Sequence, residues 1–409
     1  MSSATSDRAP GRLGFELLSV DSRTGARRGR LWTAHGPVET PAFMPVGTNA
    51  TVKAMAPWEL EELGAEMVLA NAYHLALRPG AELIERQGGL HRFAGWQRAI
   101  LADSGGFQIF SLKALCRIDA DGAEFRSHVD GSRRYLRPED VIAIQERLGV
   151  DVAMVLDECV AGDSSPDAVL AAVARTTEWA RRSRSVRTRR DQQVFAIVQG
   201  GMDLALRERS AAELADLGFD GYAVGGLSVG ERRDLTMRVA RHTVSRLPVE
   251  QPRYLMGVGT PQELVHYIAM GFDLFDCVLP TRNARNGMAF TSAGRLAIRN
   301  AEHREDSQPL DPDCRCPACR RFSRAYVRHL FSAGEILGAR LLTTHNLHFY
   351  LSHVARLRRA IEAETFLEEA RAAGVDDLGL ADGDRAATGR PQLSPAGVVP
   401  GVTSRGEFA

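Results

Sequence analysis

Three aspartates lie at or near the ends of short apolar segments, where a carboxylate could act on a ligand. Asp103 ends the segment 99–103, Asp157 ends the segment 151–157, and Asp276 lies inside the apolar stretch 273–279. A carboxylate with such neighbours needs hydrogen bonds or a chemical role, because burying a bare charge is costly. One aspartate at such a position is most simply a turn or helix-capping residue. Three at corresponding positions favour a shared functional site.

Three glycine pairs accompany these carboxylates. They occur in Ser104-Gly105-Gly106-Phe107-Gln108, in Gln199-Gly200-Gly201 and in Gly225-Gly226-Leu227. Paired glycines let the backbone approach a flat ligand closely, and Phe107 offers an aromatic face for stacking. The Gln199 amide and the exposed backbone groups could read the edge of a nucleobase through hydrogen bonds.

Three of the six cysteines form the cluster Cys314-x-Cys316-x₂-Cys319, whereas Cys116, Cys159 and Cys277 are scattered. Thiolates this close together can share one tetrahedral zinc ion, and reduced thiols favour a metal over disulfides. We favour His345, twenty-six residues beyond Cys319, as the fourth ligand. Spacing alone leaves three alternatives open: His329, His348 and His353. No open coordination position is evident, so we expect one structural Zn²⁺ per subunit.

Eight short apolar segments must position these groups. Segments of four to eight residues that are apolar throughout are typical of strands buried on both faces. They are 41–46, 66–71, 99–103, 151–157, 194–199, 222–226, 253–258 and 273–279. Helical segments separate most of them, and several open with helix-start residues, as in Thr260-Pro261-Gln262-Glu263 and Ser165-Pro166-Asp167.

Eight strands that alternate with helices predict parallel βαβ units, and eight is the number that closes a (β/α)₈ TIM barrel. A doubly wound open sheet is the alternative fold. Its glycine-rich phosphate fingerprint is missing after the first strand, where the sequence reads Val46-Gly47-Thr48-Asn49. In a barrel the carboxyl ends of all strands share one opening, so the three aspartates, Gln199 and the glycine pairs are expected to converge there.

The chain divides into four expected regions. A disordered N-terminus covers residues 1–10, and the catalytic (β/α)₈ barrel covers 11–280. A zinc-binding subdomain with closing helices follows over 281–372. The final stretch, 373–409, is rich in Gly, Pro, Asp and Ala with weak periodicity, which predicts a disordered tail.

Composition sets broader limits. The net charge is zero, hydrophobic residues make up 44% and charged residues 25%, which is ordinary for a globular protein. No apolar run is long enough to span a membrane and no signal-peptide pattern opens the chain, so we expect a cytoplasmic protein with no membrane partner. Two arginine-rich segments, 181–190 and 310–360, could bind phosphates, although ion-paired surface arginines are the simpler interpretation.

Together these segments resemble the tRNA-guanine transglycosylase family, also called queuine tRNA-ribosyltransferases, of the bacterial type. The resemblance runs from about residue 15 to residue 360. It rests on the motif Asp103-Ser104-Gly105-Gly106-Phe107-Gln108, on the motif Asp276-Cys277-Val278-Leu279-Pro280-Thr281-Arg282, and on the cysteine cluster with His345. Shorter matches include Asn71-Ala72-Tyr73-His74-Leu75, Leu156-Asp157-Glu158-Cys159 and Tyr254-Leu255-Met256-Gly257-Val258-Gly259.

The resemblance implies a pentosyltransferase that works by double displacement. Asp276 would be the nucleophile that forms a covalent ribosyl-enzyme link, and Asp103 would accept the proton of the incoming base. The base-binding residues would be Ser104, Phe107, Asp157, Gln199, Gly226, Leu227 and Met256, with Phe107 and Met256 on the two faces of the base. Arg282 and Arg285 would contact the tRNA anticodon loop. Members of the family are typically homodimers, with zinc in a structural role.

The implied reaction exchanges the wobble guanine of GUN-anticodon tRNAs (Asp, Asn, His and Tyr), flipped out of the loop, for a deazaguanine during queuosine biosynthesis. Bacterial members insert 7-aminomethyl-7-deazaguanine, and eukaryotic members insert the bulkier queuine. Val229 stands where the eukaryotic pattern has glycine, which favours the smaller base.

Two other classes of function are alternatives. A catalytically inactive partner subunit would have lost its aspartates, whereas Asp103 and Asp276 are both present. An archaeal-type relative would carry an additional C-terminal RNA-binding domain, for which the polar tail is too short.

Overall fold

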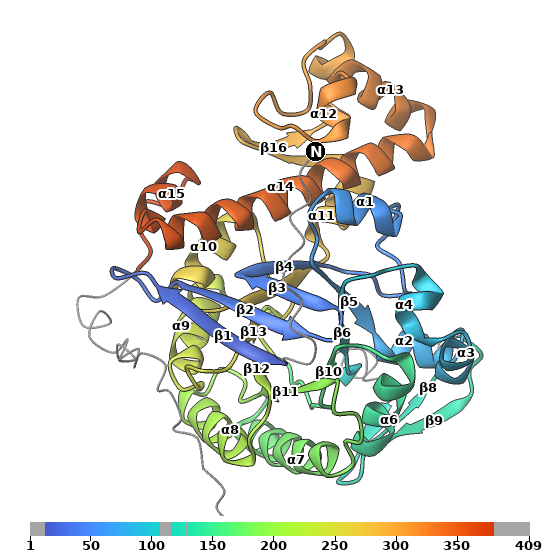
Figure 1. The fold of residues 1–409 in the computed structure, drawn as a ribbon, viewed down its shortest axis with the longest axis vertical. Helices are drawn as coiled ribbons and strands as arrows, with labels where there is room; N and C mark the ends of the chain where they lie inside the picture. The colour runs from blue at the N-terminus through green and yellow to red at the C-terminus, as the bar shows by residue number, and fades with distance from the viewer. Residues whose placement is uncertain (1–12, 107–115, 128, 380–409) are drawn as a thin grey trace, which may run out of the picture.

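A computed structural model describes residues 13–106, 116–127 and 129–379 of the chain. Its centre is a parallel eight-stranded sheet (Figure 1). The strands are β4 (Ala42–Pro45), β5 (Met67–Asn71), β6 (Ala99–Asp103), β10 (Val152–Met154), β11 (Gln193–Val198), β12 (Gly221–Val224), β13 (Arg253–Leu255) and β14 (Leu274–Cys277). The last strand pairs with the first, and a parallel bridge between Val46 and Leu69 joins β4 to β5. The sheet therefore closes on itself.

The closed sheet confirms the predicted (β/α)₈ barrel. The strands follow one another around the ring in chain order, without the reversal that a doubly wound sheet requires. Each falls within or overlaps one of the eight predicted apolar segments. Their side chains, among them Phe195, Ile197, Leu255 and Phe275, are fully buried in one large hydrophobic core.

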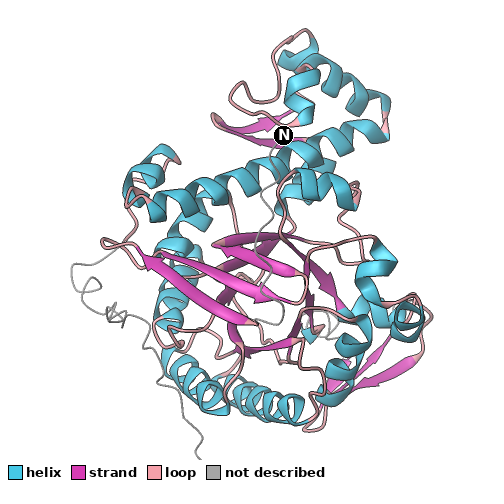
Figure 2. Cartoon of the chain, viewed as in Figure 1, coloured by secondary structure: helices cyan, strands magenta, loops and turns pink. Residues whose placement is uncertain are grey.

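Helices surround the barrel (Figure 2). They are α1 (Pro57–Glu62), α2 (Ala72–Leu77), α3 (Ala81–Arg86), α4 (Gly89–Ala94), α6 (Pro138–Leu148), α7 (Pro166–Ser185), α8 (Leu204–Leu217), α9 (Arg233–Val244) and α10 (Pro261–Ala269). The two predicted start signals are confirmed, because Thr260 and Ser165 cap α10 and α7 through their side chains, and Asp203 caps α8 in the same way. None of the described helices is both long and apolar enough to cross a membrane.

A three-stranded antiparallel sheet precedes the barrel and was not predicted from the sequence. It consists of β1 (Gly14–Val20), β2 (Arg27–Thr33) and β3 (Gly36–Thr40). Arg27 forms a buried ion pair with Asp273, and Gln193 donates to the Trp32 carbonyl. Since Asp273 and Gln193 stand at the amino ends of barrel strands, this sheet covers the end of the barrel opposite the predicted site.

A second small sheet is inserted between β6 and α6. Its strands are β7 (Cys116–Ile118), β8 (Ala123–Arg126) and β9 (Arg133–Leu136), and they pair antiparallel. Phe125 and Leu136 pack with Tyr73 and Trp179 in a separate hydrophobic cluster, so the inserted sheet packs against the outside of the barrel.

The C-terminal region forms a subdomain attached to one side of the barrel. It contains α11 (Leu279–Arg285), β15 (Met288–Thr291), β16 (Gly294–Ala297), a 3₁₀ turn (Ala301–Arg304), α12 (Pro317–Arg321), α13 (Arg324–Ala333), α14 (Ile336–Glu362) and α15 (Phe366–Ala372). Helix α14 runs from this subdomain across the barrel (Figure 1). Its residue Leu342 packs in the subdomain core, and Tyr350 and Leu357 pack in the barrel core. One helix therefore fixes the subdomain to the barrel.

Residues 373–379, which were predicted to belong to a disordered tail, have a described structure. Val375 and Leu378 are buried in the main core, so residues 373–379 are packed against the protein. The rest of that region and the N-terminal residues 1–10 lie outside the described residues.

Candidate active site and metal centre

Asp276 lies on β14 with its carboxylate held from one side. The Tyr254 hydroxyl donates to Oδ1 at 2.6 Å, and the Gly257 N–H donates to the same oxygen at 2.8 Å. Among the described residues none donates to Oδ2. The side chain is therefore oriented through one oxygen, and the other oxygen remains available to react.

The electrostatics of Asp276 balance two effects. Burial raises the pKa of its carboxyl group above the usual value, while the hydrogen bonds from Tyr254 and Gly257 oppose that rise. The phenol of Tyr254 has a pKa well above its usual value, because it is buried and feels the charges of Asp276 and Asp103. Tyr254 therefore stays a proton donor, and both predicted catalytic aspartates lie within electrostatic reach of it.

Asp103, the last residue of β6, is oriented by its neighbour on β5. The Asn71 side-chain amide donates to Oδ2 of Asp103 at 3.0 Å. The amide oxygen of Asn71 accepts from the His74 N–H and so caps α2. Asn71 thus ties the start of a helix to a carboxylate at the barrel opening.

Asp157 and Gln199 form a buried polar pair at the same opening. The Gln199 amide donates to Oδ2 of Asp157 at 2.7 Å, and Ser104 Oγ lies 3.5 Å from Oδ1. Burial raises the pKa of Asp157 to about 6, against the lowering effect of the hydrogen bonds from Gln199 and Ser104. The Gln199 Oε1 atom is buried without a hydrogen-bond partner among the described residues. A buried acceptor in that state is suited to a ligand.

Glycines let the backbone close around this pair. A Cβ on Gly106 would lie 2.2 Å from Asp157 Oδ1, and a Cβ on Gly226 would lie 2.4 Å from Gln199 Oε1. Gly226 also has a φ of +65°, a conformation that favours glycine. The predicted base-binding residues Ser104, Asp157, Gln199 and Gly226 are therefore brought together.

The remaining predicted base contacts have different outcomes. Leu227 is buried against the core, whereas Met256 is only half-buried in the loop after β13. Phe107, expected to stack on the base, lies outside the described residues.

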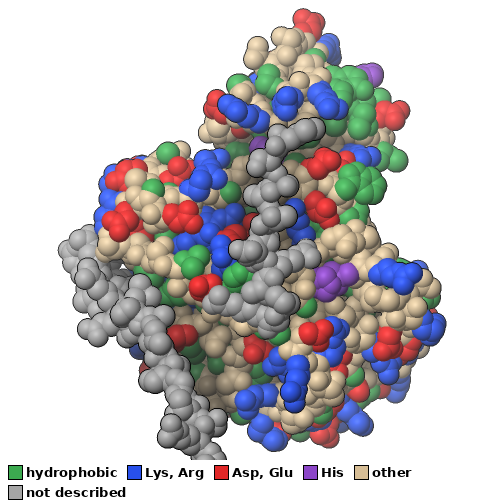
Figure 3. Space-filling model, in the orientation of Figure 1, with side chains coloured by type: hydrophobic (Ala, Val, Ile, Leu, Met, Phe, Trp, Pro, Cys, Tyr) green, Lys and Arg blue, Asp and Glu red, His purple; other side chains and the backbone are tan. Residues whose placement is uncertain are grey.

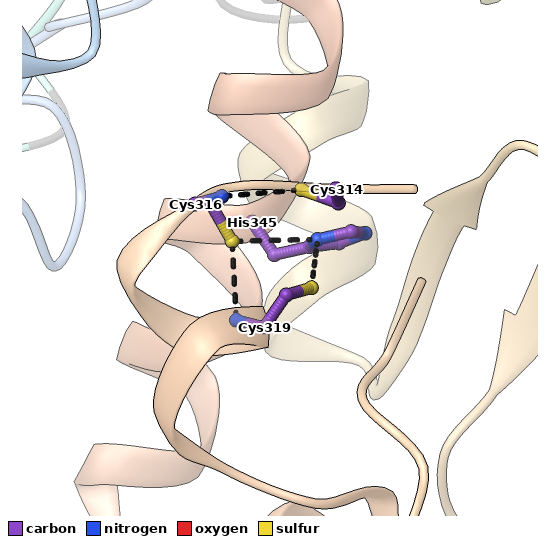
Figure 4. Close-up of side chains that lie close together, drawn as sticks. All are labelled: Cys314, Cys316, Cys319 and His345. Atoms are coloured by element: carbon purple, nitrogen blue, oxygen red, sulfur yellow. Dashed lines mark hydrogen bonds between the residues drawn. The ribbon is translucent and has the colours of Figure 1, made fainter. Parts of the chain in front are cut away.

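The cysteine cluster occurs where the sequence placed it (Figure 4). Ligand atoms of Cys314, Cys316, Cys319 and His345 all lie within 4.8 Å of one another. The cysteines come from the turn and first residues of α12, and the histidine comes from α14. Backbone N–H groups of Cys316 and Cys319 approach the sulfurs of Cys314 and Cys316 at 3.5 and 3.4 Å, which suits thiolate acceptors.

The surroundings of His345 fit a metal ligand. Its Nε2 lies 2.7 Å from the Phe290 carbonyl oxygen, which can only accept, so this nitrogen carries the proton. The unprotonated Nδ1 then faces the Cys319 and Cys316 sulfurs at 3.2 and 3.7 Å. A partner that fixes the tautomer in this way is typical of metal-bound histidines. Three thiols and one imidazole, all buried except the partly exposed Cys314, fit a structural Zn²⁺.

The alternative fourth ligands lie elsewhere. His353 contacts the Pro261 carbonyl oxygen beside α10, and His329 is exposed on α13. His348 Nδ1 lies 3.4 Å from Cys314 Sγ but is outside the group of mutually close ligand atoms.

A second cluster with metal-binding residue types joins His35, His91 and Asp151 at the opposite end of the barrel. The two imidazole rings are stacked, with centroids 3.5 Å apart and planes 13° from parallel. One ion could not lie in both ring planes, so this arrangement does not suit a shared metal. Both rings instead contact the Asp151 carboxylate, at 2.8 and 3.1 Å, and fix the β2–β3 turn and α4 to the barrel.

The sequence of this chain matches a known protein family. The family model described as Queuine tRNA-ribosyltransferase matches residues 21–373. The chain belongs to this family. The resemblance seen in the sequence is thereby confirmed, and the match covers the barrel and the C-terminal subdomain together.

Individual members of the queuine tRNA-ribosyltransferase family are similar over most of their length. Proteins of that name from Pelotomaculum thermopropionicum and Moorella thermoacetica are 54% and 55% identical to this chain, over 87% and 88% of it and 96% of each relative. A relative of the same name from Azoarcus sp. is 53% identical over 87% of this chain and 96% of its own length.

Several residues of the family site were not given roles by the sequence analysis. Tyr254 and Asn71 stood in quoted motifs, but only the fold shows that they hold Asp276 and Asp103. Arg207, on α8, is fully buried and donates to backbone carbonyls of both glycine loops. No motif indicated it, since its partners are main-chain atoms, which any residue type provides.

The two arginine-rich segments differ in the structure. In the segment 181–190, ion pairs engage Arg181, Arg182, Arg187 and Arg189. This segment is therefore mainly an ion-paired surface. In the C-terminal subdomain Arg315, Arg320 and Arg321 are exposed and form no salt bridge to a described residue. Arg282 and Arg285 lie on α11, directly after the strand that carries Asp276.

Proposed function

We propose that this chain exchanges the wobble guanine of GUN-anticodon tRNAs for 7-aminomethyl-7-deazaguanine, a step of queuosine biosynthesis. The observation that carries the proposal is the buried carboxylate of Asp276, with two donors on Oδ1 and none on Oδ2, beside the Asp157–Gln199 pair. Family membership supplies the reaction class, that of a pentosyltransferase acting on tRNA.

In the proposed mechanism Asp276 Oδ2 attacks the anomeric carbon of the target ribose as the bond from that carbon to guanine N9 breaks. Asp103 gives a proton to the departing base. The incoming deazaguanine returns the proton to Asp103 as its nitrogen attacks the same carbon and releases Asp276. Two inversions retain the configuration, and one group serves as acid and then as base, as microscopic reversibility requires.

The base is bound by two kinds of groups. Asp157 as a carboxylate accepts hydrogen bonds from the N–H groups of the guanine edge, while the second amide N–H of Gln199 and the backbone N–H groups of Gly226 and Leu227 donate to the exocyclic oxygen. Met256 and Phe107 supply the stacking faces. Arg282 and Arg285 bind anticodon-loop phosphates or bases close to the reacting nucleotide.

The loop after β12 limits the size of the substituent that the incoming base can carry. The carboxylate of Glu231 accepts from the N–H groups of Ser228 and Val229 at 2.5 and 2.9 Å, which draws this loop tight. Val229 is half-buried within it. A branched side chain there leaves room for an aminomethyl group and excludes a cyclopentenediol ring.

Zinc, held by Cys314, Cys316, Cys319 and His345, stabilises the subdomain and takes no part in the chemistry. We infer a homodimer in the cytoplasm, where tRNA is modified. Exposed apolar side chains support the dimer: Tyr326, Ile336 and Leu337 are 40%, 82% and 39% exposed, and Trp58 on α1 is 63% exposed. Figure 3 shows hydrophobic side chains gathered over α13 and the adjoining start of α14.

The test is incubation with labelled guanine and unmodified tRNA that bears a GUN anticodon. We expect label to enter the tRNA and unlabelled 7-aminomethyl-7-deazaguanine to chase it out irreversibly. Absence of incorporation into a GUN tRNA would contradict the reaction. Preferential use of queuine in competition would contradict the choice of base. If the steric argument holds, Val229→Gly should instead widen acceptance to include queuine.

A further inference from the structure

The guanidinium of Arg207 is fully buried beneath the two glycine loops that line the base pocket. Its Nε donates to the Gly201 carbonyl at 2.9 Å, and Nη1 donates to the carbonyls of Val198 and Gly225 at 2.9 and 2.8 Å. Nη2 donates to the Gly226 carbonyl at 3.3 Å. One side chain from α8 thus joins the loop after β11 to the loop after β12.

Four backbone carbonyls bond this cation directly, and the Glu231 carboxylate acts on it only from beyond ion-pair distance. Among the described residues no carboxylate lies within salt-bridge distance of Arg207, in contrast to the buried pair of Arg27 and Asp273. Burial lowers the pKa of Arg207 to about 10, so the group is still charged near neutral pH. A buried, unpaired charge is unfavourable for folding, and its presence beside a site suggests a use there.

The geometry of the peptide bond shows what that use is. In a trans peptide the C=O and N–H groups point in opposite directions. The carbonyls of Gly225 and Gly226 point at Arg207, so the N–H groups of Gly226 and Leu227 point away from it. Neither N–H donates to any described residue. Gly226 packs against Gln199, which places these donors beside the Asp157–Gln199 pair.

We propose that Arg207 is a positioning residue that aims the N–H groups of Gly226 and Leu227 at the exocyclic oxygen of the guanine base. Its charge, transmitted through the two peptides, also favours the electron density that builds on this oxygen as the base departs. The proposal rests on the base pocket described above and adds to it the group that preorganises the oxygen-binding donors.

The experiment compares two ligands and two buried arginines. Guanine and 6-thioguanine share the N–H edge that faces Asp157 and differ in the acceptor atom that faces Gly226. Calorimetric dissociation constants are measured for both bases, without tRNA, on wild type, Arg207→Lys and Arg207→Met. Arg253 supplies the matched control, because it is also buried and also donates to backbone carbonyls, those of Leu247 and Pro248, away from the site.

We expect wild type to prefer guanine over 6-thioguanine by about tenfold, near the upper end of the net worth of one neutral hydrogen bond. Arg207→Met should reduce that preference to about one, and Arg207→Lys, which keeps the charge but loses the planar set of donors, should give an intermediate ratio. Arg253→Met should leave the ratio unchanged while lowering the melting temperature.

Each outcome decides the proposal. A merely structural Arg207 would weaken both bases equally and leave the ratio intact, which would overturn the inference. If Arg207→Met does not fold, the ratio in Arg207→Lys decides. A wild type that binds neither base would instead refute the proposed base pocket and so separates the two failures.

Discussion

The carboxyl group of Asp157 should make occupancy of the base pocket depend on pH. Burial raises its pKa to about 6, so the empty pocket exchanges a proton just below neutrality. In the proposed binding mode guanine presents N–H donors to Asp157, and only the carboxylate form of this residue accepts them well. We therefore expect guanine affinity to be constant above pH 7 and to fall as the pH drops through 6.

The size of the effect follows from the pKa. With a pKa of about 6, the ionised fraction falls from about 0.9 at pH 7 to about 0.1 at pH 5, so affinity falls by about tenfold. Calorimetric titration of guanine on Asp276→Asn measures this without interference from the second buried carboxyl. Adding Asp157→Asn should remove the pH dependence and weaken binding at pH 7. An affinity that stays flat between pH 5 and 7 in folded protein would refute the reasoning.

The same pKa predicts an effect on stability. Because the pKa of Asp157 is higher in the folded chain, about 6, than its ordinary value of 3.8, the folded state binds the proton more tightly. The contribution of protonated Asp157 to the free energy of unfolding is fully present below pH 3.8, and it is lost as the pH rises through 6. The free energy of unfolding falls by about 3 kcal/mol, because the pKa of Asp157 rises from 3.8 to about 6 and each step of one in pKa is worth about 1.36 kcal/mol. Asp157→Asn should therefore unfold at higher urea concentration than wild type at pH 8, with little difference at pH 4. Destabilisation at pH 8 would contradict this account.

Three further outcomes are expected. Asp276→Asn should lose guanine exchange by at least about a thousandfold and should form no denaturation-resistant adduct with tRNA; exchange at the wild-type rate would remove Asp276 as the nucleophile. Cys316→Ser should bind less than one zinc per chain by metal analysis and melt at lower temperature, since metal affinity is also folding free energy; full occupancy would show that the assigned ligands are wrong. Ile336→Asp should shift the protein towards monomer in light scattering; an unchanged dimer would place the interface on another face.

The barrel could be predicted from the sequence because its strands are buried on both faces. Such strands appear as continuous apolar segments, and helix caps such as Thr260 mark the intervening helices. The N-terminal sheet could not be predicted in this way. Its strand β2 begins with Arg27 and Arg28, which are buried only because Asp273 and Glu39 pair with them. Nothing in the local pattern indicates that two consecutive arginines lie inside.

In the candidate site, too, some residues could be located from the sequence and others could not. The aspartates could be located because they end apolar segments, and the zinc ligands because three of them lie within six residues. The residues that orient them act across the fold. Tyr254 is 22 positions from Asp276, and Asn71 is 32 positions from Asp103. Arg207 donates only to main-chain carbonyls, and every residue type has such a carbonyl, so the sequence does not indicate which residues are its partners. Local sequence therefore gives the reacting groups, and tertiary contacts give the groups that position them.

The buried charges around the base pocket share one property: each is bonded by dipoles and forms no ion pair with a described residue. Asp276 is held by a hydroxyl and an N–H, Asp157 by an amide and a hydroxyl, and Arg207 by four carbonyls. An ion pair would neutralise each group and remove its interaction with a ligand, whereas dipoles orient it and leave most of its field in place. The empty pocket is consequently strained electrostatically, as the raised pKa of Asp157 shows. In the proposed binding mode a guanine-like base relieves that strain, because its N–H edge faces the carboxylate and its oxygen faces the donors aligned by Arg207. On this proposal the base is the missing hydrogen-bond partner of the site, and the pocket holds the departing and the incoming base by the same contacts.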